Sequence, residues 1–202
     1  MVDLGEYIFD KLRWLSLFHP IRNIFPSIEK SYGFVEIWVL FNLSCSIVFL
    51  FISSSKNILW WEIILLSFAV LRIFEIFIYQ INVLLFDQYR LGEKYELRGV
   101  ERIIILLLIN YIEILFWFAL LYRNFHFAFR SKYTILNSFW GSLYFSLVTM
   151  STLGYGDITP ITHFGEILNI VQTLLGLFMA LLIIARFNSL LPTPKKFKNK
   201  KS

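Results

Sequence analysis

The sequence predicts an all-α membrane protein with four spanning helices and one short helix that enters the membrane and returns as a loop. Three observations support this fold class. The 202-residue chain is 57% hydrophobic and contains 22 phenylalanines. Charged residues make up 16% of it, against roughly 25% in soluble domains. Its apolar runs are long and do not alternate with polar residues, which is typical of spanning helices rather than of strands.

Residues 1–34 precede the first spanning run and have helical spacing near their start. Apolar side chains recur at Leu4, Ile8, Leu12 and Leu15, with charged residues largely elsewhere. The segment is too polar to span. We interpret residues 1–34 as a cytoplasmic, interfacial segment, which either lies on the membrane surface or packs against the rest of the protein.

Residues 35–79 are predicted to form two accessory spans. Val35–Ser53 and Ile58–Tyr79 each have about the twenty residues that a bilayer core requires. The following residues, 80–102, mix acidic and basic side chains, and we expect the end of the second helix followed by a cytoplasmic linker.

Residues 103–187 contain two further spans around a short apolar stretch. Ile103–Tyr122 and His163–Phe187 have the length and composition of spanning helices. Between them, Asn137-Ser138 can cap a short helix because Asn and Ser side chains accept hydrogen bonds from its first N–H groups. Residues 188–202 form a tail with five lysines, and we expect this tail to be cytoplasmic.

The loop after the short helix is the most specific signal in the chain. Two glycines alternate with bulkier residues, and glycine enters the positive-φ region at little steric cost. Such a run can hold successive carbonyls on one side, and rings of carbonyl oxygens can replace the hydration shell of a cation. The run consists of Thr152, Leu153, Gly154, Tyr155, Gly156 and Asp157.

Residues 137–187 resemble the pore region of tetrameric potassium channels with one pore loop per subunit. The resemblance implies a homotetramer that conducts K⁺ as its permeant ion, with no other cofactor. It implies that K⁺ binds at Thr152, Leu153, Gly154 and Tyr155, where Thr152 supplies a hydroxyl as well as a carbonyl. Gly156 would complete the turn, and Asp157 would lie at the outer mouth.

The residues behind the loop depart from the pattern of that family. Members commonly carry adjacent tryptophans where this chain has Tyr144 and Phe145, and some carry a glutamate where it has Val148. Thr149 matches a small polar residue at the end of the short helix. We expect these four side chains to support the filter. We also expect Tyr144 to donate a hydrogen bond to Asp157, with the filter held less tightly than in other members.

Two further features bear on gating. Gly176 falls where many members have a hinge glycine, although a glycine there also suits close packing between helices. A voltage sensor needs several arginines at regular spacing in one span. The second span contains only Arg72, so classical voltage sensing is not expected.

Three ionisable residues lie inside the predicted spans. A charge at the bilayer centre costs roughly 2.5–3.5 kcal/mol, so each needs a partner. From the span boundaries, the depths of Arg72 and Glu113 differ by about 5 Å at 1.5 Å per residue. We predict that Arg72 pairs with Glu113 or, three residues along its own helix, with Glu75. Such a pair either locks the accessory spans to the pore or acts as a switch.

Basic residues in the N-terminal segment, the linker and the tail place both termini in the cytoplasm, with the loop entering from outside. We expect an integral protein of the plasma membrane. The net charge of +5 sits largely in the tail and does not indicate nucleic-acid binding. Three scattered histidines, His19, His126 and His163, have no metal-ligand spacing, so an enzyme is not expected. The alternatives are a weakly selective cation channel and a non-conducting regulatory or scaffold subunit with a pore-like fold.

Overall fold

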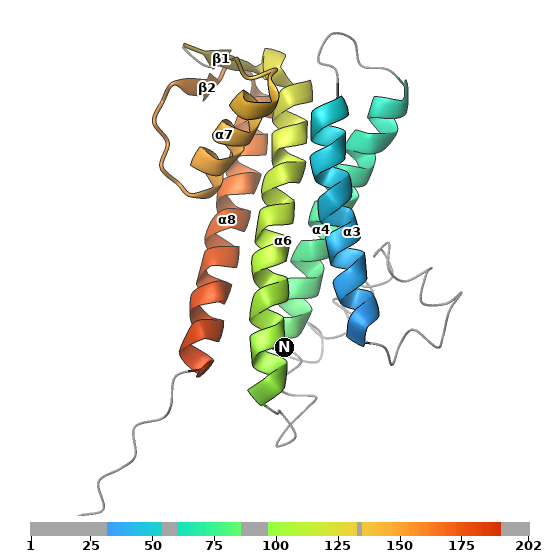
Figure 1. Ribbon diagram of the computed structural model, residues 1–202. Helices are drawn as coiled ribbons and strands as arrows, with labels where there is room; N and C mark the ends of the chain where they lie inside the picture. Colours follow the sequence, from blue (N-terminus) through green and yellow to red (C-terminus); the bar gives the residue numbers. More distant parts are fainter. Residues whose placement is uncertain (1–31, 54–59, 86–96, 133–134, 191–202) are drawn as a thin grey trace, which may run out of the picture.

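The computed structural model describes residues 32–53, 60–85, 97–132 and 135–190 (Figure 1). Helices dominate this part of the chain, as the sequence predicts. The long helices are α3 (Tyr32–Ile52), α4 (Trp60–Leu85), α6 (Leu97–Asn124) and α8 (His163–Leu190). The shorter elements are η3 (His126–Ala128), β1 (Phe129–Ser131), α7 (Phe139–Met150) and β2 (Ile158–Pro160).

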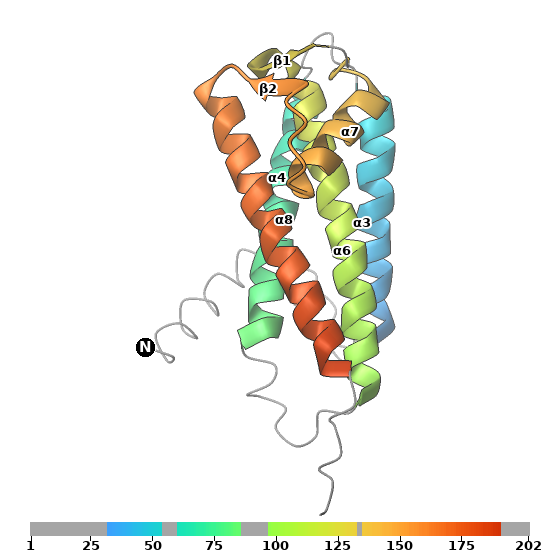
Figure 2. The same cartoon turned by 90° about the vertical axis from the view of Figure 1, so that its left-hand side faces the viewer.

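Helix α6 is the central element of the bundle. It contacts α3 and α4 on one side and α7 and α8 on the other (Figures 1 and 2). In the most apolar stretch of α6, 61% of the residues are buried inside the protein, against 22% in α3 and 28% in α8. The protein core therefore lies around α6, while α3 and α8 keep most of their apolar surface exposed.

Three of the described helices are long and apolar enough to cross a membrane, at Gly33–Ile52, Arg102–Asn124 and His163–Asn188. Helix α4 lies beside them and has 26 residues, but it carries Glu62, Arg72 and Glu75. It is not among the candidate spans found by length and composition. The short α7 is apolar as well, and it ends in the loop that the sequence singles out.

The segment 80–102, which is predicted to hold the end of the second helix followed by a cytoplasmic linker, begins and ends in helix. Helix α4 continues to Leu85, and α6 begins at Leu97. Arg102 is accommodated in α6 because its Nε lies 2.7 Å from Glu36 Oε1 of α3. Residues 86–96, most of the segment 1–34, and residues 191–202 of the tail lie outside the described residues.

The segment before α7 contains a feature that the sequence does not predict. Strand β1 pairs antiparallel with β2, with Phe129 opposite Pro160 and Ser131 opposite Ile158. Lys132 N also donates to Asp157 O at 2.9 Å. These bonds fasten the end of the Thr152–Asp157 loop and the following β2 to the segment that connects α6 with α7.

Candidate functional site

Helix α7 begins at a side-chain cap and a close backbone approach. Ser138 has extended backbone angles, and its Oγ accepts a hydrogen bond from Gly141 N at 3.0 Å. This confirms Ser138 as the cap. A Cβ on Gly141 would lie 2.1 Å from Ile135 O, so a larger residue would push the preceding turn away from the helix. The glycine thus allows the tight entry into α7.

The backbone of the Thr152–Asp157 loop alternates in handedness. Positive φ angles occur at Thr152 (60°), Gly154 (54°) and Gly156 (76°), while Leu153 and Tyr155 between them are not in that region. Alternation of right- and left-handed residues brings successive N–H groups to one side and carbonyls to the other. The predicted role of the two glycines is therefore consistent with the backbone, and Thr152 adopts the same conformation without being glycine.

Two hydrogen bonds hold the start of the loop against the last turn of α7. Thr152 N donates to Thr149 O at 3.1 Å, and Leu153 N donates to Val148 O at 3.0 Å. A left-handed conformation at a non-glycine residue costs about 1–2 kcal/mol. These bonds help to keep Thr152 in that conformation, which is common at functional sites.

One side of the loop is uncovered in a single chain. Leu153 is 59% and Tyr155 66% exposed. A Cβ placed on Gly154 or Gly156 would meet no atom within 4 Å. Figure 2 shows the loop between α7 and α8 on the side that faces the viewer.

The side chains behind the loop divide into two groups. Tyr144 stacks on Tyr155 with ring centroids 6.4 Å apart and an interplanar angle of 2°. Its hydroxyl interacts with the nearby Asp157 carboxylate, and the predicted hydrogen bond between them stays a prediction. Phe145 lies instead among the aromatic rings of Tyr122, at 4.6 Å, and Phe129, at 5.3 Å. Only Tyr144 of this adjacent pair contacts the loop through polar atoms.

A cavity of about 350 Å³ separates parts of the loop from the helices behind it. Buried Val148 and the Thr149 side chain line it from α7. Asn169 and Thr173 line it from α8. The loop is therefore backed in part by open space with hydroxyl and amide groups around it.

Tyr122 connects all three helices of this region. Its hydroxyl donates to Asn169 Oδ1 of α8 at 3.0 Å, and its ring centroid lies 4.6 Å from that of Phe145 of α7. The tyrosine itself belongs to α6 and is fully buried. Sequence reasoning did not identify Tyr122 or Asn169, because neither belongs to a local motif.

A second polar connection joins the same helices. Gln172 Nε2 of α8 donates to Ser146 O at 3.0 Å and to Ser146 Oγ at 2.7 Å. Ser146 Oγ in turn donates to Leu115 O of α6 at 2.7 Å. An amide inside an apolar helix is the sequence signal that could have pointed to Gln172.

Gly176 lies where α8 crosses the end of α7. A Cβ at this position would be 2.4 Å from Met150 O. Helix α8 continues through Gly176 to Leu190. The structure therefore shows that Gly176 allows close packing of α8 against α7, and its role as a hinge stays a prediction.

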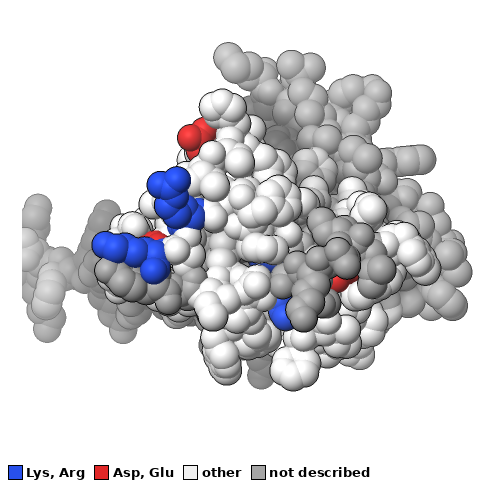
Figure 3. Space-filling view, turned by 90° about the horizontal axis from the view of Figure 1, so that it is seen from above, with Lys and Arg blue, Asp and Glu red and all other residues white. Residues whose placement is uncertain are grey.

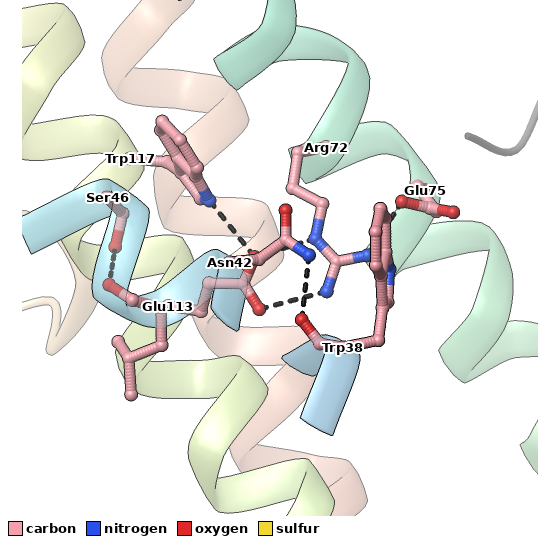
Figure 4. Close-up of polar contacts among 8 residues, drawn as sticks. Trp38, Asn42, Ser46, Arg72, Glu75, Glu113 and Trp117 are labelled. Carbon is pink, nitrogen blue, oxygen red and sulfur yellow. Dashed lines mark hydrogen bonds and ion pairs between the residues drawn. The ribbon is translucent and has the colours of Figure 1, made fainter. Parts of the chain in front are cut away.

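Arg72 contacts both of its predicted partners, Glu113 and Glu75 (Figure 4). Arg72 Nε lies 2.7 Å and Nη2 3.1 Å from the two carboxylate oxygens of Glu113. Its Nη1 lies 2.6 Å from Glu75 Oε2. All three side chains are buried between the helices. The arginine thus joins α4 to α6 within the bundle.

Two tryptophans complete this cluster. Trp117 Nε1 donates to Glu113 Oε1 at 3.1 Å. The Arg72 guanidinium carbon lies 5.9 Å from the centre of a Trp38 ring on α3, within cation–π range. Figure 4 shows Asn42 and Ser46, also of α3, near Glu113 and Arg72. The cluster therefore involves α3, α4 and α6.

Arg123, in the last turn of α6, connects the end of α3 to the entry of α7. Its Nε donates to Asn137 O at 3.0 Å, directly before the capping Ser138. Its Nη1 donates to Leu50 O near the end of α3. This use of Arg123 explains why a basic side chain lies at the end of the bundle opposite Arg102.

The end of the bundle that carries β1 and β2 is mostly uncharged. Figure 3 looks down on this end and shows only isolated basic and acidic groups among the described residues. His163 Nδ1 lies 3.1 Å from Glu166 Oε2, and both are exposed. In the described ranges, no three His, Cys, Asp or Glu residues group together in a way that could hold a metal ion.

Comparison with known proteins adds one match to this geometry. Residues 104–192 match the model of a protein family described as ion channel. The match includes three quarters of α6 and all of α7, the loop and α8, and it leaves α3 and α4 outside. None of the curated proteins and none of the solved structures in the comparison matches the chain. Residues 104–192 are thus similar to an ion-channel family, and together with the long apolar helices this match supports an integral membrane protein.

Proposed function

We propose that the protein is a potassium-selective channel and that four copies form its pore. The observation that carries this proposal is the alternation of φ along the loop, positive at Thr152, Gly154 and Gly156. Four such loops around an axis stack rings of carbonyl oxygens, which replace the water around K⁺. Thr152, Leu153, Gly154 and Tyr155 supply these carbonyls, and Thr152 adds its hydroxyl. Neighbouring ions then move in single file by mutual repulsion.

The exposed surface supports assembly into a homotetramer. One loop cannot enclose a pore, and its open side carries the exposed Leu153 and Tyr155. Helix α8 continues this open surface, because its exposed apolar side chains run along most of its length. They include Ile167, Ile170, Val171, Leu174, Leu177, Leu181 and Ile184. Neighbouring copies would cover part of this face, and lipid would cover the exposed face of α3.

The helix directions support an orientation with both termini in the cytoplasm. The ends of the described chain, at the start of α3 and the end of α8, lie at the same end of the bundle (Figure 1). The loop and the β1–β2 sheet lie at the opposite end, which we assign to the outside of the plasma membrane. The basic residues near the chain termini favour this assignment.

The test is the reversal potential of the purified full chain in a planar bilayer, with K⁺ on one side and Na⁺ on the other. A potential near the K⁺ equilibrium value supports the proposal. A Gly154→Ala variant serves as the control for contaminating channels, since a side chain at φ 54° is strained and should abolish the current. The absence of current under all stimuli tried would favour a non-conducting subunit and contradict the proposal.

A second candidate is a weakly selective cation channel. The observation that favours it is the cavity behind the loop, together with the absence of a polar contact from Phe145 or Val148 to Asp157. A loop held chiefly through Tyr144 has fewer constraints on the spacing of its carbonyls. A reversal potential near zero in the same experiment would select this candidate.

A further inference from the structure

Helix α8 is attached to α7 through a buried amide. Gln172 and Ser146 are both fully buried, and Gln172 Nε2 donates to the backbone oxygen and the hydroxyl of Ser146 at 3.0 and 2.7 Å. The Ser146 hydroxyl in turn donates a hydrogen bond to Leu115 O of α6 at 2.7 Å. Two side chains therefore hold three helices in one register.

A second contact lies one helical turn further along both helices. Gly176 of α8 lies against Met150 of α7, at a distance where a Cβ would be 2.4 Å from Met150 O. Residues 172 and 176 of α8 thus meet residues 146 and 150 of α7, both pairs spaced four apart. The glycine allows the close approach, and the amide fixes how the two helices are positioned along each other.

The last turn of α7 carries this position into the loop. Val148 O and Thr149 O, which follow Ser146 on the same helix, accept hydrogen bonds from Leu153 N and Thr152 N. A shift of α8 along α7 would pull on Ser146 and, through this rigid turn, on the start of the carbonyl-bearing loop.

Packing stability alone does not account for the amide. Gln172 Oε1 is buried and has no hydrogen-bond partner in the described part of the chain. An unpaired buried acceptor costs about as much as a hydrogen bond gains. A leucine would fill a similar space without leaving an acceptor unpaired. What glutamine adds is a directional bond from α8 to α7.

We propose that Gln172 is a positioning residue that couples the inner helix to the filter and so sets how long the pore stays conductive. This inference rests on the proposed channel function. Gln172 touches neither the ion nor the loop, and it acts through Ser146. Its removal should therefore alter the lifetime of the conducting state and leave ion selectivity unchanged.

The experiment compares single-channel records of the full chain with those of Gln172→Leu and Ser146→Ala in planar bilayers. The mean conducting time of Gln172→Leu should change by about two- to tenfold, the factor that corresponds to one net hydrogen bond. Ser146→Ala should shift the mean conducting time in the same direction. The double variant should differ from the wild type by less than the sum of the two single effects. The K⁺/Na⁺ permeability ratio should stay that of the wild type. Gln80→Leu, at a buried position of α4, is the matched control and should change nothing.

Thermal melting of the detergent-solubilised protein separates coupling from support. We expect the melting temperature of Gln172→Leu not to fall, because the substitution removes an unpaired acceptor along with the bonds. A lower melting temperature with unchanged conducting times would overturn the inference. If Gln172→Leu fails to assemble, Ser146→Ala decides alone, and unchanged conducting times in that variant also overturn it. A silent wild-type chain would instead remove the proposed function, and this inference with it.

Discussion

The buried charge cluster allows a prediction with a defined size. In Arg72→Met, Glu113 and Glu75 both lose the guanidinium that contacts them at 2.7 and 2.6 Å. Glu113 is completely buried and Glu75 is 6% exposed, so water cannot replace the lost partner. Methionine keeps most of the side-chain volume, which restricts the perturbation to charge and hydrogen bonding.

Breaking one partner out of a buried ion pair costs about 3–5 kcal/mol. Arg72→Met should lie at the upper end of that range, because it strands two carboxylates. Glu113→Gln should cost less, since Trp117 Nε1 at 3.1 Å still has an acceptor. Glu75→Gln should cost least, because one of the three hydrogen bonds that the two carboxylates accept from Arg72 ends on Glu75.

The assay is unfolding of the detergent-solubilised protein by SDS, followed by tryptophan fluorescence. Trp38 and Trp117 lie in the cluster and should report its exposure. The matched control is Arg102→Met, because the Arg102–Glu36 pair is 28% and 48% exposed and should contribute at most about 1 kcal/mol.

Two results would refute the reasoning. One is a loss for Arg72→Met no larger than that for Arg102→Met. The other is a double variant, Arg72→Met with Glu113→Leu, whose loss equals the sum of the two single losses. Residues in one ion pair should instead be coupled, so that the double variant loses less unfolding free energy than the sum of the two single losses.

Two further predictions concern the filter and the contact between α7 and α8. Tyr144→Phe removes the hydroxyl that we expect to hydrogen bond to Asp157 and should speed the slow inactivation of the current by a few fold; an unchanged rate under a maintained stimulus would show that the hydroxyl has no part in it. Gly176→Ala should destabilise the protein by about 1–3 kcal/mol through overpacking against Met150. Gly33→Ala, where a Cβ meets nothing within 4 Å, is its control in the same melting assay, and equal melting temperatures would leave the hinge as the reason for Gly176.

Among the described residues, several contacts connect α3 and α4 to the helices of residues 104–192. The Arg72 cluster joins α4 to the middle of α6. Arg123 joins the end of α3 to Asn137, which immediately precedes the cap of α7. A third contact is the edge-to-face pair of Phe77 and Phe178, at 5.3 Å, between α4 and α8. These contacts give α3 and α4 a physical connection to the helices around the Thr152–Asp157 loop.

Much of this arrangement can be predicted from the sequence. The signals that predict it are either local patterns or the depth of a residue within its predicted span. The apolar runs set the positions of the helices, apart from a few residues at their ends. The Thr152–Asp157 run allows positive φ at two glycines. The pairing of Arg72 with Glu113 follows from similar depths in neighbouring predicted spans, within reach of the side chains, since charges in an apolar medium need partners.

Other features depend on how helices rotate and cross, and no local pattern encodes that. Tyr122 and Asn169 are 47 residues apart, and Ser146 and Gln172 are 26 apart, so each pair meets only after packing has fixed which faces of the helices touch. The same holds for Gly176, where the sequence allows either a hinge or a close contact. The distance to Met150 shows the close contact. Local chemistry thus determined what each segment can form, and tertiary packing decided which side chains hold the Thr152–Asp157 loop in place.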